Sequence, residues 1–211
     1  RIFLSGSPRH DKFFRNSHND SSDTKLRDLV TLGMLDGQNA IFSTELFLRF
    51  ESILKKIFLT LESIPNLSFV VKLHPSLQEN NIQMKNFIQE LNPKITIKQF
   101  SSILDDIQEC DVMINIFTEI YGSTVMLEGL ILKKPVLNIS LDVRPYKFEF
   151  EKDNAVLSIS YEDNIDKNIR KILFDKNLQA ILIENGFNHV THYLSHPGNA
   201  SKELARILSS F

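Results

Sequence analysis

Four short polar segments of this sequence each follow an apolar run. They are Gly6-Ser7-Pro8-Arg9, Lys72-Leu73-His74-Pro75, Lys98-Gln99-Phe100 and Tyr121-Gly122-Ser123-Thr124. Between them they carry hydroxyls, cations, an imidazole and an aromatic ring, which are groups that hold phosphates and cover ring bases. We therefore examine them first as candidate parts of an anion- or nucleotide-binding site.

The segment Gly122-Ser123-Thr124 opens a predicted helix that follows a buried strand. Free N–H groups and the positive end of the helix dipole attract anions at such a point, and two hydroxyls assist. Ser and Thr are also ordinary N-cap residues. Glu128 lies one turn beyond Thr124 among apolar neighbours, where a carboxylate needs a partner. That partner is either a ribose hydroxyl or a basic side chain such as Lys72.

His74 follows the apolar run 67–73, and Pro75 ends the strand and fixes the turn. This places the imidazole at the expected ligand edge, where it can bind a phosphate or act as an acid or base. Lys72 adds a cation to the same strand end. Phe100 offers an aromatic face that could cover a nucleobase, or it belongs to the core.

The turn Gly6-Ser7-Pro8-Arg9 combines a flexible backbone, a hydroxyl and a guanidinium suited to bidentate phosphate contacts. A linker turn with a solvated Arg9 is the competing interpretation. We expect Asp105-Asp106 to form a solvated helix face. His189, His192 and His196 lie close in sequence, but no Cys or acidic pattern accompanies them, so we predict no metal site. No residue can be assigned as the catalytic base.

The elements that must position these residues alternate between strand and helix. The predicted strands are 40–43, 67–73, 95–97, 111–117, 135–139 and 155–159, and the predicted helices are 45–64, 79–91, 103–109, 123–132, 165–175, 176–185 and 201–209. This order predicts an α/β fold, a Rossmann-like parallel sheet with helices on both faces. In such sheets ligands bind at the carboxyl ends of the strands.

The first part of the chain breaks this alternation. Residues 10–36 are polar and irregular, with at most a helical turn within 24–35. This stretch reads as a surface loop that precedes the alternating part of the chain. The chain begins with Arg1-Ile2-Phe3-Leu4, as if in mid-strand and without an initiator Met, so we expect a fragment of a longer protein.

The composition is that of an ordinary soluble globular protein. Hydrophobic residues make up 42% of the 211, and the net charge of −2 gives no basic surplus for nucleic acid. Cys110 is the only cysteine, which excludes an intrachain disulfide and indicates a reducing compartment. No apolar run approaches a membrane span and no signal region opens the chain. We expect a cytoplasmic protein.

Several known motifs are missing from the sequence. There is no G-x-x-x-x-G-K-[ST], no G-x-G-x-x-G after a strand and no G-x-S-x-G. Their absence disfavours an ATPase, a dinucleotide oxidoreductase and an α/β-hydrolase. With seven glycines in the chain, phosphates must be held by helix ends and side chains.

Four longer segments stand in a characteristic order, namely Lys72–Pro75, Cys110–Asn115, Gly122–Leu130 and Lys134–Leu137. Their order resembles that of the C-terminal, donor-nucleotide-binding domain of GT-B glycosyltransferases of surface-polysaccharide biosynthesis. This type has a His-Pro and a Ser-Thr motif and is related to sialyl and Kdo transferases and to CDP-glycerol glycerophosphotransferases. Gly6–Asp11 also looks like the segment linking the two GT-B domains, and the closing helices, with 196–201, are similar to the terminal helices of the family. The resemblance implies an interdomain linker segment and surface loop, 1–36, and a nucleotide-binding domain, 37–211. Gly129 and Lys134 depart from the family's usual Ala and Gly.

The resemblance implies roles for particular residues. His74 would contact the phosphate or nucleotide of the donor, Ser123 and Thr124 would cap the phosphates, and Glu128 would bind the ribose. The donor would be a nucleotide-activated sugar or a CDP-glycerol-like molecule, bound without a metal or cofactor. A glycan or lipid-linked acceptor, and commonly the catalytic base, would come through an N-terminal domain, with peripheral association at the inner face of the membrane.

Two alternatives stay open at this point. One is an isomerase like the UDP-N-acetylglucosamine 2-epimerases, which share the GT-B fold, although their Ser-Gly-Gly is absent here. The other is a nucleotide-binding or scaffold module without turnover.

Overall fold

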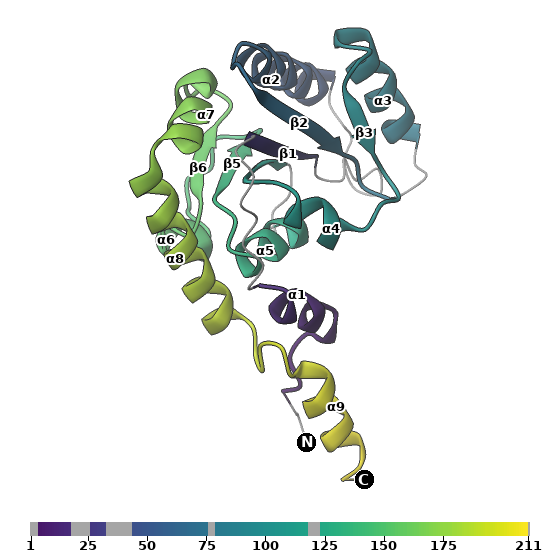
Figure 1. The fold of residues 1–211 in the computed structure, drawn as a ribbon, viewed down its shortest axis with the longest axis vertical. Coiled ribbons are helices and arrows are strands. Elements are labelled where there is room, and N and C mark those ends of the chain that lie inside the picture. Colours follow the sequence, from purple (N-terminus) through teal and green to yellow (C-terminus); the bar gives the residue numbers. More distant parts are fainter. Residues whose placement is uncertain (1–3, 18–25, 33–43, 76–78, 118–122, 211) are drawn as a thin grey trace.

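The computed structural model describes residues 4–17, 26–32, 44–75, 79–117 and 123–210. Within them six strands form one sheet in the order β3-β2-β1-β4-β5-β6 (Figure 1). All five strand pairs are parallel, which confirms the predicted Rossmann-like α/β fold. The strands are β1 Leu26–Leu32, β2 Leu67–Lys72, β3 Thr96–Lys98, β4 Val112–Phe117, β5 Val136–Ser140 and β6 Leu157–Ser160.

One face of the sheet is covered by α2 (Thr44–Glu62), α3 (Glu79–Leu91) and α7 (Ile165–Phe174). Successive strand residues point to opposite faces, so Ile114 and Ile116 of β4 pack against this layer. The helix α2 buries a stripe of apolar side chains at helical spacing against the sheet. The buried stripe is Phe50, Ile53, Leu54, Ile57, Phe58 and Leu61.

A second apolar cluster lies on the opposite face, where Met113 and Val136 point. The helices that cover it include α4 (Ile103–Gln108), α5 (Thr124–Ile131) and the C-terminal half of α8 (Lys176–Tyr193). Two shorter helices, α1 (Asp11–Arg15) and α6 (Glu149–Lys152), contribute Phe13 and Phe150 to it. Helices therefore cover both faces, as predicted.

Most predicted elements agree with the structure to within about two residues, but α8 runs on to Tyr193 instead of ending at 185. The helical turn expected within 24–35 is wrong, because Leu26–Leu32 forms β1 between β2 and β4. Residues 26–32 therefore belong to the sheet, and the division of the chain at residues 36 and 37 otherwise stays a prediction. Residues 1–3 and the predicted strand 40–43 lie outside the described residues.

The polar residue Asp28 explains why the sequence pattern of β1 did not predict a strand. It is 2% exposed, and both carboxylate oxygens are buried without a hydrogen-bond partner among the described residues. Burial, with the charge of Asp111, raises the pKa of Asp28 well above its ordinary value and so favours the neutral form of this side chain. Pairing with strands on both sides outweighs the polar local sequence.

A row of polar side chains crosses three strands at one level of the sheet. Asn115 of β4 donates through Nδ2 to Asn138 Oδ1 of β5 at 2.8 Å, and Asn138 Nδ2 donates to Ser158 Oγ of β6 at 3.3 Å. Ser158 Oγ then donates to Glu151 Oε1 at 2.7 Å, which also accepts from Arg144 Nη2 at 2.8 Å. The row therefore connects the centre of the sheet to the loop that follows β5.

The two ends of the described chain lie side by side, below the sheet in Figure 1. Gly6 has φ +80°, and a Cβ there would lie 2.1 Å from the carbonyl oxygen of Ser195. Asp11 accepts hydrogen bonds from the N–H groups of Ala200 and Ser201 at 3.0 and 2.8 Å. These N–H groups open α9 (Ala200–Leu208), so Asp11 caps that helix from far away in the sequence.

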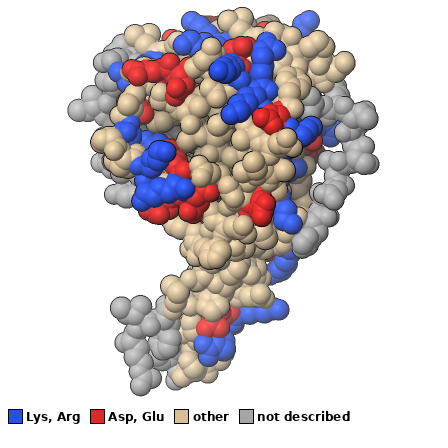
Figure 2. Space-filling model, turned by 90° about the vertical axis from the view of Figure 1, so that its left-hand side faces the viewer, with Lys and Arg blue, Asp and Glu red and all other residues tan. Residues whose placement is uncertain are grey.

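On the face drawn in Figure 2, Lys and Arg side chains mingle with Asp and Glu. Among the helices that the structure describes, none combines the length and the apolar character needed to cross a membrane.

Candidate functional site

The carboxylate of Glu128, in the second turn of α5, has one partner. Its side chain is 1% exposed, and Oε1 accepts from Arg9 Nη2 at 2.9 Å. The other oxygen, Oε2, is buried and has no hydrogen-bond partner in the described part of the chain. Burial raises the pKa of Glu128, and the Arg9 guanidinium opposes this effect only in part. A buried oxygen without a donor is costly, and a ligand hydroxyl would satisfy it.

The sequence around Glu128 fixes where α5 lies. Ser123 is the N-cap residue, and its hydroxyl accepts from the Met126 N–H at 3.4 Å. A Cβ on Gly129 would lie 2.3 Å from the sulfur of Met113, so the glycine lets α5 pack closely on β4. This contact gives a physical reason for Gly129, where the resembled family usually has Ala.

A hollow of about 410 Å³ adjoins Glu128. The short 3-10 helix η1 (Pro8–His10), α1, the first residue of α4 and the first turn of α9 enclose it. Arg9, Lys12 and Arg15 line it against two carboxylates, those of Asp11 and Glu128. Cations outnumber carboxylates on this wall, which suits an anion.

Both oxygens of Asp11 accept from the N–H groups that open α9, and the charge of Arg15 also acts on this carboxylate. Burial alone would raise the pKa of Asp11, but the hydrogen bonds from Ser201 and Ala200 lower it below the ordinary value. Asp11 is therefore ionised and committed to holding η1 and α1 against α9.

His10 lies between Arg9, which contacts Glu128, and Asp11, which caps α9. It is 5% exposed, and both ring nitrogens are buried without a hydrogen-bond partner in residues 4–17 or elsewhere in the described chain. Burial, with the charge of Arg9, lowers the pKa of His10, so the ring is neutral near pH 7. Sequence reasoning missed His10 and Asp11 because they fall in a polar, aperiodic stretch; Pro8, which suits the first position of a helical turn, was the available signal.

Lys72 does not reach this hollow. It is 6% exposed, and its Nζ donates to the carbonyl oxygen and the hydroxyl of Ser101, each at 2.7 Å. The same nitrogen lies 2.9 Å from Asp106 Oδ2. The expectation that Asp106 is solvated is wrong, because it is 4% exposed. Adjacent helix residues point in different directions, so only Asp105 faces the solvent.

Two other predicted residues lie at neighbouring strand ends. His74 is half-buried, and its carbonyl oxygen accepts from Gln99 Nε2 at 3.4 Å. Phe100 lies in the loop after β3 and is 68% exposed, so it is not a core residue. Ile103, three residues later, lines the hollow beside Glu128. The loop after β3, which carries Phe100, therefore leads into a helix whose first residue lines the Glu128 hollow.

The remaining predicted residues are placed as follows. Thr124 is exposed at the first turn of α5, whereas Gly122 lies outside the described residues. Ser7 is half-buried and precedes η1, and Gly6 packs on the backbone of Ser195. Of the predicted set, the structure joins Arg9 directly to Glu128.

The described residues contain no group of three or more His, Cys, Asp or Glu side chains that could hold a metal ion. Of the three C-terminal histidines, His189 pairs with Asp153 at 2.6 Å and stacks on Tyr193. His192 Nδ1 lies 2.7 Å from the carbonyl oxygen of Asn188.

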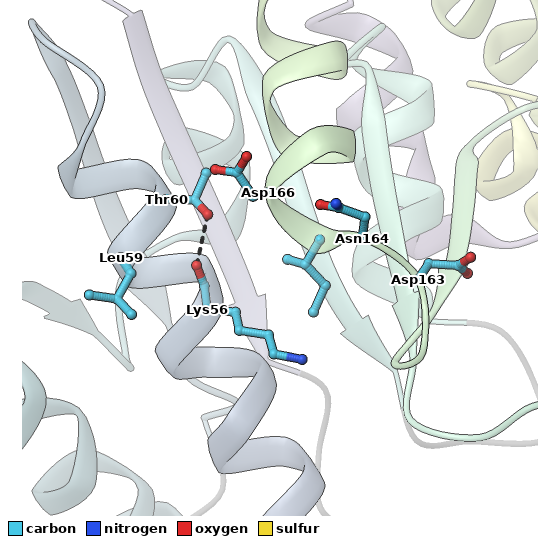
Figure 3. A pocket seen from close by; sticks show the side chains of 7 residues that line it. Lys56, Leu59, Thr60, Asp163, Asn164 and Asp166 are labelled. Atoms are coloured by element: carbon cyan, nitrogen blue, oxygen red, sulfur yellow. Dashed lines mark hydrogen bonds between the residues drawn. The ribbon is translucent and has the colours of Figure 1, made fainter.

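A second hollow of about 450 Å³ lies between α2 and the start of α7 (Figure 3). The Thr60 hydroxyl donates to the carbonyl oxygen of Lys56, and Asn164 accepts from the Lys167 N–H as the N-cap of α7. Asp163 accepts from the Ser160 N–H at 2.7 Å. These polar groups stabilise local turns, and none is a buried orphan, so we prefer the Glu128 hollow as the candidate site.

Comparison with known proteins shows a likeness of fold. The matches include HepE from Anabaena with UDP-glucose (14% identity, 97% of this chain and 54% of that one, TM-score 0.54). They also include WaaG, a glycosyltransferase involved in lipopolysaccharide biosynthesis (16%, 95% and 51%, 0.53). A third is the spinosyn rhamnosyltransferase SpnG with thymidine diphosphate (16%, 87% and 46%, 0.57).

The chain therefore shares a Rossmann-like α/β fold with part of each of these glycosyltransferase structures. It spans about half of the length of the solved structures that it resembles. No protein-family model matches the sequence, and no curated protein matches it.

Proposed function

We propose that this chain is the donor-nucleotide-binding half of a glycosyltransferase, or glycerophosphotransferase, that acts in cell-surface polysaccharide biosynthesis. One observation carries the proposal: a buried carboxylate, Glu128, keeps an oxygen without a donor beside a hollow lined by cations. Proteins with the same fold have been solved with UDP-glucose and with thymidine diphosphate, which supports a nucleotide ligand.

In this proposal the ribose hydroxyls donate to Glu128. The start of α5, where Thr124 is exposed, binds the phosphates through its N–H groups and the Thr124 hydroxyl, and Ser123 and Gly122, the latter outside the described residues, belong to the same proposed segment. Arg9 and His74 add positive charge and a hydrogen-bond donor beside the departing phosphate. Stabilising that developing charge is the contribution this half makes to the transfer step.

Phe100, exposed at the same edge, covers the base of the nucleotide. Gly6 and Ser7 act indirectly, by setting the course of the chain into η1. The reaction needs no metal or cofactor in this scheme. The acceptor, a glycan or a lipid-linked molecule, and the catalytic base come from another part of the protein, and the enzyme works in the cytoplasm at the inner face of the membrane.

The direct test is calorimetric titration of the chain with CMP, CDP and UDP. We expect one of them to bind, and Glu128→Gln to weaken it about 10- to 100-fold, because a hydrogen bond to a charged group contributes about 1.5–3 kcal/mol. Glu109→Gln, a change at a carboxylate that is 64% exposed, is the matched control and should bind as the unaltered chain does. No binding of any nucleotide by the folded chain would refute the donor-site proposal.

The activity itself needs a second assay with the full-length protein and a nucleotide sugar. A transferase consumes the donor only when an acceptor is present. Isomerisation of the nucleotide sugar without an acceptor would instead indicate an epimerase, and binding without any turnover would indicate a scaffold module.

A further inference from the structure

A buried ionic network lies beneath the loop that carries Phe100. Asp106 Oδ1 accepts from Lys98 Nζ at 2.8 Å, and Oδ2 accepts from the Ser101 hydroxyl at 2.6 Å and lies 2.9 Å from Lys72 Nζ. Lys72 also donates to the carbonyl oxygen of Ser101. The network thus ties the end of β2, the end of β3, the loop between β3 and α4, and α4 itself to one another.

The loop has further attachments on both sides. The Leu73 N–H donates to the Lys98 carbonyl at 2.9 Å, and Gln99 donates to the carbonyl of His74. Ser102 caps α4 by accepting from the Asp105 N–H. Residues 99–102 are therefore fixed at their two ends and in the middle.

Removing these charged side chains from water costs free energy. Burying an ammonium and a carboxylate together gains little stability over apolar residues of the same size, so a buried pair of this kind is better explained by the geometry it imposes. Here the fixed geometry presents one large apolar side chain, Phe100, to the solvent at 68% exposure. An aromatic ring held in place but left uncovered is suited to stacking on a flat partner.

We infer that Lys72 and Asp106 are positioning residues that hold the loop 99–102 so that Phe100 stacks on the ring base of a bound nucleoside diphosphate. The inference rests on the proposed function and deepens it. It gives Lys72 an indirect role through Ser101 in place of direct contact with the donor. The base, and not the phosphates, is the part of the ligand that depends on this network.

The test uses Phe100→Trp as a reporter, because the chain has no tryptophan. The network is removed by Lys72→Met together with Asp106→Leu, which takes out both charges and leaves no lone buried ion. CDP and UDP are the probes with a base, and inorganic pyrophosphate is the probe without one. Glu109→Gln, at the exposed end of the Lys98 contacts, is the control.

We expect a nucleotide to quench the introduced indole and pyrophosphate to leave it unchanged. Loss of the network should abolish the quenching and raise the Kd for the nucleotide about tenfold, the size of one base–aromatic stack. The Kd for pyrophosphate should change less than about twofold. Quenching that survives loss of the network, or an equal loss for pyrophosphate, would overturn the inference.

Two further outcomes separate this inference from the proposed function. Calorimetric binding of a nucleotide without quenching refutes the role of Phe100 and leaves the proposed function standing. If neither nucleotide binds, the proposed function fails, and the time-resolved anisotropy of the indole decides the positioning. Faster depolarisation after loss of the network supports it, and equal depolarisation refutes it.

Discussion

Two carboxylates on neighbouring helices, Asp106 of α4 and Glu128 of α5, are both almost fully buried but are satisfied very differently. Asp106 receives three donors and has no oxygen left over. Burial would raise the pKa of Asp106, but the hydrogen bonds from Lys98, Ser101 and Lys72 bring it below its ordinary value. Glu128 receives one donor from the residues that the structure describes, and burial keeps its pKa raised.

Under the proposed function, the difference separates a carboxylate that holds structure from one that binds a ligand. A saturated buried ion is part of the scaffold, and its removal should unfold the region around it. A buried carboxylate with an oxygen that lacks a donor lowers the stability of the fold, so its removal should weaken ligand binding and leave the fold intact.

The largest effect should come from Asp106→Ala. The ammonium of Lys72 would stay buried without its counter-ion, and we expect the free energy of unfolding to fall by about 3–5 kcal/mol. Urea unfolding followed by circular dichroism measures this. Asp105→Ala, at the exposed neighbour, is the control and should stay within about 0.5 kcal/mol of the unaltered chain. A loss as small as that for Asp106→Ala would end the contrast.

Glu128→Gln should show the opposite pattern. The amide is the same size and costs less to bury than a carboxylate, and Arg9 is 62% exposed, so water can solvate the guanidinium that loses its partner. We expect a free energy of unfolding within about 1 kcal/mol of the unaltered chain, together with the loss of nucleotide affinity given above. A destabilisation matching that of Asp106→Ala would make Glu128 a scaffold residue instead.

Asp11→Ala tests a third buried carboxylate, whose two oxygens accept from the N–H groups that open α9. No buried cation is left behind, so the expected loss is that of an N-cap, about 1 kcal/mol. Amide hydrogen exchange should become faster in α9 and stay unchanged in β4. Asp166→Ala, which removes an exposed surface pair, is the comparison, and equal exchange in both variants would remove Asp11 from this role.

The pH dependence of stability should have opposite signs at the two sites. Asp106, with a folded pKa below its ordinary 3.8, contributes stability above that pH and loses it as the pH falls towards the folded value. Glu128, with a folded pKa above its ordinary 4.5, makes the protein less stable as the pH rises from there through the folded value.

Urea unfolding from about pH 3 to about pH 7 would separate them. Asp106→Asn should flatten the acid side of the stability curve. Glu128→Gln should become more stable relative to the unaltered chain as the pH rises through the upper window. Parallel curves for Glu128→Gln and the unaltered chain would mean that burial does not act on this carboxylate as the structure indicates.

Most of the sheet was predictable, because runs such as 67–73 and 111–117 are largely apolar and lie between helical patterns. The strand β1 was not, since Arg27 and Asp28 interrupt its pattern and its stability comes from partners far away in the sequence. Helix ends with a capping side chain, such as Ser123 and Asn164, were close to their predicted positions.

For the candidate site, Glu128 could be selected from its apolar surroundings alone. Its partner could not, because Arg9 lies 119 residues away and no local rule connects the two. Asp106 was misjudged for the same reason: Lys72 and Lys98 reach it through the order of the strands, which the sequence does not state residue by residue.

The row of polar side chains on β4, β5 and β6 also determines how these strands can align. Runs of Val, Ile and Leu are interchangeable, so apolar packing alone would tolerate a sheet shifted along itself. A shift of one residue would turn Asn138 to the opposite face, and a shift of two would move it about 7 Å from both partners. The match of Asn115, Asn138 and Ser158 at one level therefore disfavours misaligned pairings of these strands, and the same register lets Ser158 and Arg144 share Glu151.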